Sequence, residues 1–390
     1  MNSADLNTIL ADSERLGEQG IVDELLDAVR RGGTSASDAS RKIDLALSTF
    51  RELWSEPNES SLAVLSNLAE SYARLGGFGK ADSLYTEVLE LGEQLDEPLL
   101  LADARRKRGR VRRRQNRWED ALADTEQARR TFVDLGDDLG IARCRQAEGI
   151  IHRERANYES AREAYAHALE AGERLDHAAL IQASTANLAI VDLMIGEYDL
   201  ALTGFEQALV KSQELGNAVS ECRAYHNLGL CHTFREVWVE ALDNYENSLA
   251  ISERIGLMEM AWKSYVQKAF VYLQLKDSSL AATYCARALD ISEEIGTPLG
   301  KANVYRVLGR LVGERGDYVT GSSILKQGLD IFRNYDDALG EGEILREIGE
   351  LEQARSGENA DQALQSAIDV FERIGARGEV DRTRAILESR

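Results

Sequence analysis

Proline is almost missing from this sequence, because only Pro57, Pro98 and Pro298 occur among 390 residues. Proline interrupts helices, so its scarcity indicates long helices joined by short connections. Aromatic residues make up only 6% of the chain, and no apolar run approaches the roughly 18 residues that span a bilayer. The N-terminal residues show no basic region followed by an apolar stretch. We therefore expect neither a secretory signal nor a membrane partner.

Cysteine is also scarce, and its four copies follow no disulfide framework, which favours a reducing cytoplasmic location (Cys144, Cys222, Cys231 and Cys285). The phosphate-binding GxxxxGK[ST], GxSxG, HExxH and GxGxxG motifs are all missing. The sequence thus gives no residues to support an enzyme and predicts no cofactor. Positive charge is in the minority, with 46 basic against 67 acidic residues and a net charge of −21. Such a surface is soluble and poorly suited to nonspecific DNA binding.

What the sequence does have is repetition with a period of 40 residues. Alanines recur at that step, Gly321 continues the series and Ala360 follows one residue early: Ala81, Ala121, Ala161, Ala201, Ala241 and Ala281. A second small residue follows seven positions later, and a third column, Leu95 to Ile374, follows seven beyond that. Such spacing places all three columns on one face of a helix. We call this helix B and expect it to end at Gly92, Gly136, Gly216, Gly256 or Gly296.

A second helix, helix A, precedes helix B in each unit and carries a small residue in its middle. Pro98 and Pro298 occupy equivalent positions after helix B, where each can begin the next helix A. An aromatic residue stands three positions before most of the column alanines, as Phe78 and Trp118 illustrate. The small residues of helix A are Ala69, Gly109, Gly149, Ala189, Gly229, Ala269, Gly309 and Gly349.

These columns resemble the tetratricopeptide repeat, and the 40-residue unit resembles the longer Leu-Gly-Asn subclass that includes kinesin light chains. The resemblance covers about residues 60–376. It implies an all-α fold, a right-handed α-solenoid superhelix of antiparallel helix pairs with helix A on the inner surface. We predict an N-terminal helical segment or cap (1–58, a degenerate repeat), about eight 40-residue repeats (59–376) and a C-terminal capping helix (377–390).

Counting from the small residue of helix A, one helical face should line the groove. In the first three units this face is rich in arginine, and in the next three it carries apolar residues and no acid. We therefore predict a groove that binds an acidic, partly apolar peptide or partner segment. Its predicted residues are Arg74, Arg106, Arg110, Arg113, Arg114, Arg143, Arg153, Ile190, Leu193, Met194, Arg223, His226, Leu230, Phe234, Lys263 and Phe270.

Structural ion pairing is the competing interpretation of the basic segment 105–117. Arg110 can pair with Glu70 on the neighbouring helix A, and a buried Arg108–Glu148 pair would explain a charge at a packing position. A zinc site at Cys222 and His226 is weakly indicated, because no second ligand pair accompanies them. RNA or polyanion binding through 105–117 also stays open. However, aromatic residues are not interleaved with these arginines as in single-strand binders, and residues 1–58 show no basic recognition helix.

We accordingly interpret the chain as a non-enzymatic, cytoplasmic scaffold or adaptor. The main alternative is a peptide-sensing regulatory receptor whose superhelix changes its compaction on ligand binding. Assembly into homo-oligomers is a further possibility. No metal or other cofactor is predicted.

Overall fold

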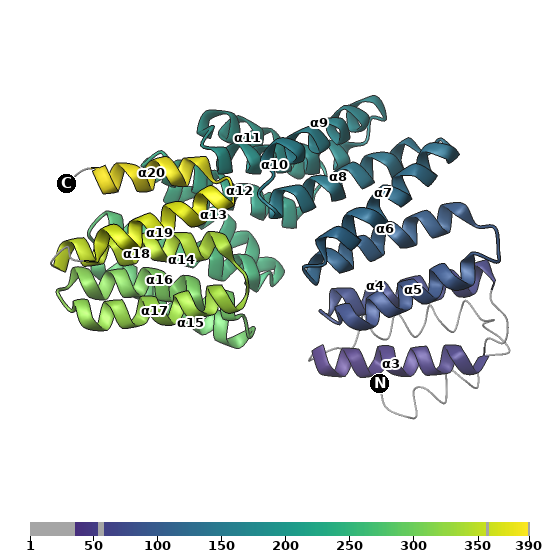
Figure 1. Ribbon diagram of the computed structural model, residues 1–390, viewed down its shortest axis with the longest axis horizontal. Coiled ribbons are helices and arrows are strands. Elements are labelled where there is room, and N and C mark those ends of the chain that lie inside the picture. Colours follow the sequence, from purple (N-terminus) through teal and green to yellow (C-terminus); the bar gives the residue numbers. More distant parts are fainter. Residues whose placement is uncertain (1–35, 54–57, 356–358, 389–390) are drawn as a thin grey trace. The chain divides into compact units, whose positions relative to one another are not determined.

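The computed structural model describes residues 36–53, 58–355 and 359–388. These residues form helices only, connected by short turns (Figure 1). Of the predicted N-terminal segment 1–58, residues 1–35 and 54–57 lie outside the described residues. In chain order the helices are α3 (Ala36–Leu53), α4 (Glu59–Arg74), α5 (Phe78–Gly92), α6 (Pro98–Arg114), α7 (Trp118–Leu135), α8 (Asp138–Glu154), α9 (Tyr158–Arg174), α10 (Ala178–Ile195), α11 (Tyr198–Glu214), α12 (Ala218–Phe234), α13 (Trp238–Ile255), α14 (Met258–Gln274), α15 (Ser278–Glu294), α16 (Pro298–Glu314), α17 (Tyr318–Asn334), α18 (Ala338–Arg355), α19 (Ala360–Arg373) and α20 (Arg377–Glu388).

The even-numbered helices from α4 to α18 are the predicted A helices, and each is followed by its B helix. Where contacts are described, each A helix packs most extensively against the B helix that follows it, as α16 does with α17. The alanine column confirms this arrangement, since its members from Ala81 to Ala281 have no solvent exposure. Pro98 and Pro298 begin α6 and α16 as predicted. The fold is therefore an α-solenoid of antiparallel helix pairs.

Two details of the end of helix B differ from the prediction. Helix α5 does end at Gly92 as predicted, but Gly92 does not take the left-handed conformation that Gly136, Gly216, Gly256 and Gly296 take, and Asp96 (φ 53°) makes that turn instead. The third apolar column lies at the helix ends and is 38–52% exposed from Leu175 to Tyr335. From Leu175 to Tyr335 this column occupies the last residue of helix B or the one after it, so its members are partly exposed rather than buried in the core.

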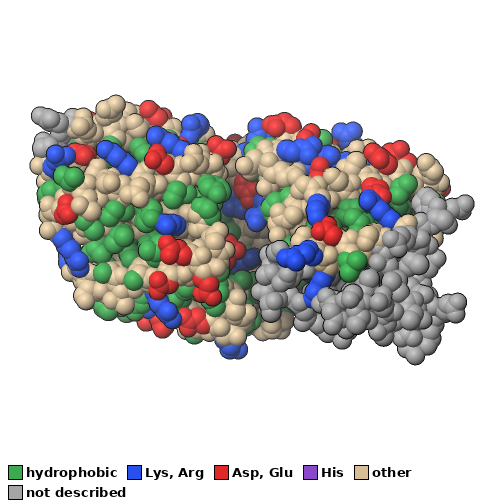
Figure 2. Space-filling view, turned by 90° about the horizontal axis from the view of Figure 1, so that it is seen from below, with side chains coloured by type: hydrophobic (Ala, Val, Ile, Leu, Met, Phe, Trp, Pro, Cys, Tyr) green, Lys and Arg blue, Asp and Glu red, His purple; other side chains and the backbone are tan. Residues whose placement is uncertain are grey.

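The chain divides into two compact units, the first ending at Ile151 and the second beginning at His152. In unit 1 the main apolar cluster runs from Ile43 on α3 to Val111 on α6. Unit 2 has successive clusters along its repeats, and the last one includes Val380 of α20. On the face shown in Figure 2, acidic and basic side chains are interspersed.

By length and composition alone, one described helix, α10, could cross a membrane, with a mean hydropathy of 1.6 over 18 residues. The expectation that no segment approaches this limit was therefore too strict. Asp192 is the only charged residue in α10, and it forms an ion pair with Arg162 on α9. In this structure α10 packs against α9, α11 and α20 in the register of a repeat helix.

Candidate functional site

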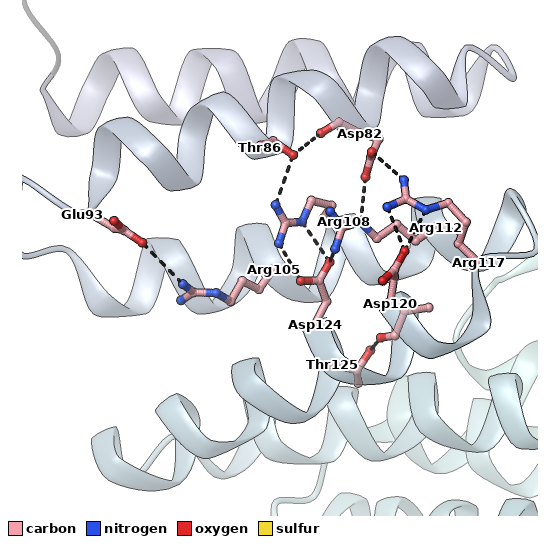
Figure 3. A network of polar contacts seen from close by, with 11 residues as sticks. Asp82, Thr86, Glu93, Arg105, Arg108, Arg112, Arg117, Asp120, Asp124 and Thr125 are labelled. Carbon is pink, nitrogen blue, oxygen red and sulfur yellow. Dashed lines mark hydrogen bonds and ion pairs between the residues drawn. The ribbon is translucent and has the colours of Figure 1, made fainter.

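Arg108 and Arg112 of the basic helix α6 are held inside unit 1 by carboxylates (Figure 3). Arg108 meets Asp124 of α7 through two bonds, Nε to Oδ2 at 2.8 Å and Nη2 to Oδ1 at 2.6 Å. Arg112 donates to Asp82 of α5 and to Asp124, each at 2.9 Å. The side chain of Asp124 is only 5% exposed. These arginines therefore cross-link α5, α6 and α7.

The predicted Arg108–Glu148 pair was wrong. Glu148 instead pairs with Arg145 at 2.9 Å and with Arg129 at 3.4 Å. Arg108 finds its partner in its own hairpin because Asp124 stands at an inward position of α7. The first repeat has Leu84 at that position, and the third has Ala164. An acid at an otherwise small or apolar position was a sequence signal for the partner of Arg108.

A different set of arginines surrounds an open pocket of about 320 Å³ between α4 and α6. We call it the basic pocket. It brings together four of the predicted groove residues, Arg74, Arg110, Arg113 and Arg114, and its remaining lining residues are Glu70, Ala73, Gly76, Phe78 and Val111. Four arginines and one glutamate are thus among the described residues that line this pocket.

Glu70 is already engaged within the basic pocket. It forms ion pairs with Arg110, as the competing interpretation predicted, and with Arg74 at 3.3 Å, and it accepts a hydrogen bond from Tyr85 at 3.2 Å. Burial disfavours the charged carboxylate, but Arg110, Arg74 and Tyr85 outweigh burial and lower the pKa of Glu70. Glu70 is therefore ionised at neutral pH and balances about one positive charge of the basic pocket.

Arg114 is exposed and has no carboxylate partner among the described residues. Its guanidinium carbon lies 5.6 Å from the centre of the Phe78 ring. A cation held over an aromatic face keeps its N–H groups available at its edge. Phe78 was predicted only as a turn residue, so its contribution to this site was missed.

The remaining predicted basic residues lie outside the basic pocket. Arg106 pairs with Asp103 on its own helix, and Arg153 pairs with Glu154 at 3.8 Å. Lys263 pairs with Glu259 at 2.7 Å. Arg143 and Arg223 are exposed. The structure therefore gathers only part of the predicted basic face into one site.

In unit 2, three predicted apolar residues, Leu230, Phe234 and Phe270, line one small cavity of about 50 Å³. Ile190 and Leu193 belong instead to the apolar cluster around Phe205. Leu193 is buried, and Ile190 and Met194 are partly buried. The opposite walls of the cavity consist of charged residues of α16, α18 and α20, which were not predicted as site residues: Arg306, Glu343, Arg346 and Arg382.

His226 does not line a groove, which corrects its predicted position. It is buried between helices, and its Nδ1 lies 3.0 Å from Ser264 Oγ of α14. Ser264 donates to Ser248, and Ser248 lies within hydrogen-bond distance of the thiol of Cys222. Burial lowers the pKa of His226 to about 3, with a smaller contribution from the charge of Lys263. Cys222 and His226 are thus joined through two serines in a packed interior.

The described residues contain no group of three or more His, Cys, Asp or Glu side chains placed to hold a metal ion. All four cysteines are free and buried, and burial raises the pKa of the Cys144, Cys231 and Cys285 thiols to about 12. Thiols that stay protonated are poor nucleophiles.

The packing of successive antiparallel helix pairs defines a helical-repeat protein of the α-solenoid class. The family model for the tetratricopeptide repeat matches residues 60–132 and 181–254. These residues are therefore tetratricopeptide repeats, as the alanine and glycine columns predicted.

Comparisons with individual proteins agree with this assignment. The Tonsoku-like protein of Drosophila melanogaster is 20% identical over 233 residues, which are 54% of this chain and 17% of that protein. The chain thus spans far less than the full length of this relative. A solved Rap protein, complexed with competence and sporulation factor, has a TM-score of 0.69 at 15% identity and covers 94% of this chain and 99% of its own. The Rap conjugation gene regulator of plasmid pLS20, in complex with the Phr* peptide, has a TM-score of 0.62 at 14% identity, with 92% and 96% covered. At these identities the likeness concerns the fold.

Proposed function

We propose that this chain is a non-enzymatic adaptor that binds an acidic segment of a partner protein, and that the basic pocket receives its carboxylates. The observation that carries the proposal is the charge of the described pocket lining, where Glu70 is the only acid and lies among Arg74, Arg110 and the exposed Arg114. In a chain of net charge −21, such a local excess attracts acidic ligands and orients their approach.

The geometry of the basic pocket supports a carboxylate ligand. Arg110 and Arg74 are already oriented by Glu70, so little side-chain entropy is lost when a second carboxylate binds beside it. Arg114 can supply a two-pronged pair of N–H donors, the arrangement that fits a carboxylate best. A volume of about 320 Å³ is suited to one or two side chains of a peptide.

RNA or polyanion binding is less well supported. Several cations of the segment 105–117 are neutralised within unit 1, among them Lys107, Arg108, Arg112 and Arg117. A nucleic-acid track needs a continuous row of available cations. Because these cations are paired, the available arginines form a compact site. That site fits a peptide side chain and is too short for the backbone of a nucleic acid.

The test is fluorescence anisotropy with a fluorescein-labelled synthetic helix built of alternating Glu and Leu pairs. Arg114→Glu should weaken its binding at least tenfold, because reversing an unpaired charge replaces attraction with repulsion. Arg130→Glu is the matched control, since Arg130 is an exposed arginine of α7 whose partner is Glu126 and which does not line the basic pocket. Equal affinities of wild type and both variants would contradict the proposal. Tighter binding of a polyuridine RNA, with a steep salt dependence, would favour the polyanion alternative.

A second candidate is a peptide-sensing receptor, and one observation favours it. In unit 2, helix α20 contacts α10 and α12, although 148 residues separate Arg382 from Phe234. Such a long-range contact gives the repeats a closed state that a ligand could open. The solved Rap regulator in complex with the Phr* peptide has a similar fold. A ligand-dependent change of the radius of gyration in small-angle scattering would support a receptor, and an unchanged radius would support a rigid adaptor.

A further inference from the structure

Helix α20 does more than cover the end of the last repeat. It packs on α19, as a capping helix should, but it also lies against α10 (Figure 1), and its Arg382 reaches Phe234, the last residue of α12. The guanidinium of Arg382 lies 4.6 Å from the centre of the Phe234 ring, and its Nη2 donates to the Phe234 carbonyl oxygen at 3.3 Å. Phe234 is itself stacked on Tyr198 at 5.6 Å.

The N-terminal end of α20 is held by backbone contact. A Cβ added to Gly378 would lie 3.2 Å from the Cα of Gly196 and 3.2 Å from the hydroxyl of Tyr198. These contacts are tighter than a Cβ normally makes, so a side chain at this position would require the neighbouring turn to shift by a few tenths of an ångström. The first turn of α20 therefore sits directly on the turn between α10 and α11.

A carboxylate of α20 is buried against an arginine of unit 2. Glu379 forms an ion pair with Arg346 of α18, and both side chains are 8% exposed. Burial would raise the pKa of Glu379, but Arg346 and Arg382 outweigh burial and lower it. Beside this pair, Arg306 meets Glu343 at 2.9 Å. Arginines of unit 2 thus already bind a carboxylate, and that carboxylate is Glu379 of the chain itself.

With α20 in place, little of the predicted apolar groove is open. The cavity lined by Leu230, Phe234 and Phe270 has about 50 Å³, with Arg382 in its wall. A water molecule takes about 30 Å³ of the liquid, so this space is too small for a large apolar side chain. A neighbouring cavity of about 210 Å³, which Phe270 also lines, is bounded by Arg382 and Ile386 of α20. A helical segment that packs on Leu230 and Phe234 therefore competes with α20 for the same surface.

Helix α20 has few contacts to hold it there. Of its 12 residues, the buried ones are Glu379, Val380 and Thr383, and Val380 is the only apolar one. Leu387 is partly buried against the last cluster. Because apolar burial supplies most of the stabilisation of a docked helix, an element with one buried aliphatic residue opens more readily than the core helices.

We propose that α20 is a self-ligand: it occupies a binding site formed by α12, α14, α16 and α18, and this site takes helical segments of the same chemistry. Such a segment carries an acid for Arg346, a cation three residues later for the ring and carbonyl of Phe234, and an aliphatic residue four further on at the position of Ile386. A cation at the C-terminal carbonyls of α12 also meets the negative end of that helix. The proposal concerns unit 2 and does not depend on the basic pocket of unit 1.

The probe is a fluorescein-labelled peptide with the sequence of residues 376–388, and its control is a scrambled peptide of the same composition. The opened variant of the full chain is Gly378→Leu/Arg382→Ala, which removes the close approach to α10 and the contact with Phe234 without leaving a buried charge unpaired. Arg384→Ala is the matched control, since Arg384 is exposed and pairs with Glu372 of α19. The peptide should bind the opened variant at least tenfold more tightly than wild type or the control. Equal affinity in all three, or equal binding of the scrambled peptide, would overturn the proposal.

Hydrogen exchange on the wild-type chain provides the same test if the opened variant does not fold. With isotope-labelled protein, so that its α20 is distinguishable from the peptide, an excess of peptide should accelerate exchange in α20 at least tenfold. The same addition should not accelerate exchange in α12, which keeps an occupied site. Unchanged exchange in α20, or equal acceleration throughout unit 2, would show that α20 is a permanent part of the fold.

Discussion

Single residues in this protein show how burial decides which charges a helical repeat tolerates. His226 is packed beside Ser264 and the ring of Tyr245, whose centre is 5.6 Å away, and Lys263 is the charge that acts on it. Arg108 is largely buried as well, with 13% of its side chain exposed, and Asp124 receives two of its hydrogen bonds. A buried cation is retained where a carboxylate meets it, and a buried imidazole without one stays neutral.

The neutral state of His226 makes the stability of the protein depend on pH. Its pKa is about 3 in the folded protein against an ordinary value of 6.5. Between these values the unfolded chain binds a proton that the folded protein does not, so stability falls as the pH falls below 6.5. Lowering the pH from 7 to 5 should cost about 2 kcal/mol through this group alone.

The variant His226→Gln isolates this contribution, because a glutamine amide can hydrogen-bond to Ser264 but does not titrate. Urea unfolding at pH 7 and pH 5 should show a loss of stability that is about 2 kcal/mol larger for wild type than for the variant. Equal losses in the two proteins would show that His226 is protonated without cost.

At the scale of helices, the close contacts of the A and B helices are set by residues without bulk. Gly321 of α17 faces Gly309 and Gly313 of α16, and a Cβ on Gly321 would lie 2.7 Å from the Gly309 carbonyl oxygen and 3.0 Å from the Gly313 nitrogen. The other repeats have alanine at this column. Here Gly321 and the glycines that it faces on α16 let the two backbones come closer. A Cβ added at Gly321 would meet backbone atoms, which cannot rotate away as a side chain can.

Gly321→Ala should therefore destabilise the protein, although alanine is the better helix former. The better helix propensity contributes up to about 1 kcal/mol, and the overpacking costs about 1–3 kcal/mol. The matched control is Gly79→Ala in α5, where nothing lies within 4 Å of the added Cβ. Thermal unfolding should show a lower midpoint for Gly321→Ala and an equal or higher one for Gly79→Ala. A stabilised Gly321→Ala would mean that α16 and α17 can separate without cost.

The helix pairs were predictable from the sequence because they depend on local spacing. Alanine and glycine columns at a 40-residue step fixed the A and B helices, and Pro98 marked the start of α6. The partners of the arginines were not predictable to the same degree. A long side chain on α6 can reach either adjacent hairpin, and spacing alone did not reveal that Arg108 turns to Asp124 rather than to Glu148. The contact of Arg382 with Phe234 depends on small rotations that accumulate over several repeats, and no single repeat encodes that sum.

At the scale of the whole molecule, a repeat array spreads its stability over neighbours instead of one central core. The described packing follows this rule within each unit, because each helix contacts mainly the helices one or two positions away, and α20 is the described exception. A destabilising substitution in one repeat should therefore lower the stability mainly of that repeat and its neighbours. The network around Asp124 offers a test, since this single carboxylate holds both Arg108 and Arg112.

Asp124→Ala should destabilise unit 1 by about 3 kcal/mol, because it leaves a buried guanidinium without its partner. Asp120→Ala removes an ion pair of the same helix whose carboxylate is 51% exposed, and it should cost less than about 1 kcal/mol. In hydrogen exchange, Asp124→Ala should reduce protection in α5, α6 and α7 while α16, α17 and α18 keep their wild-type rates. Equal loss of protection in both sets would mean that the repeats unfold as one cooperative body. In that case the destabilising effect of Gly321→Ala should likewise extend to unit 1.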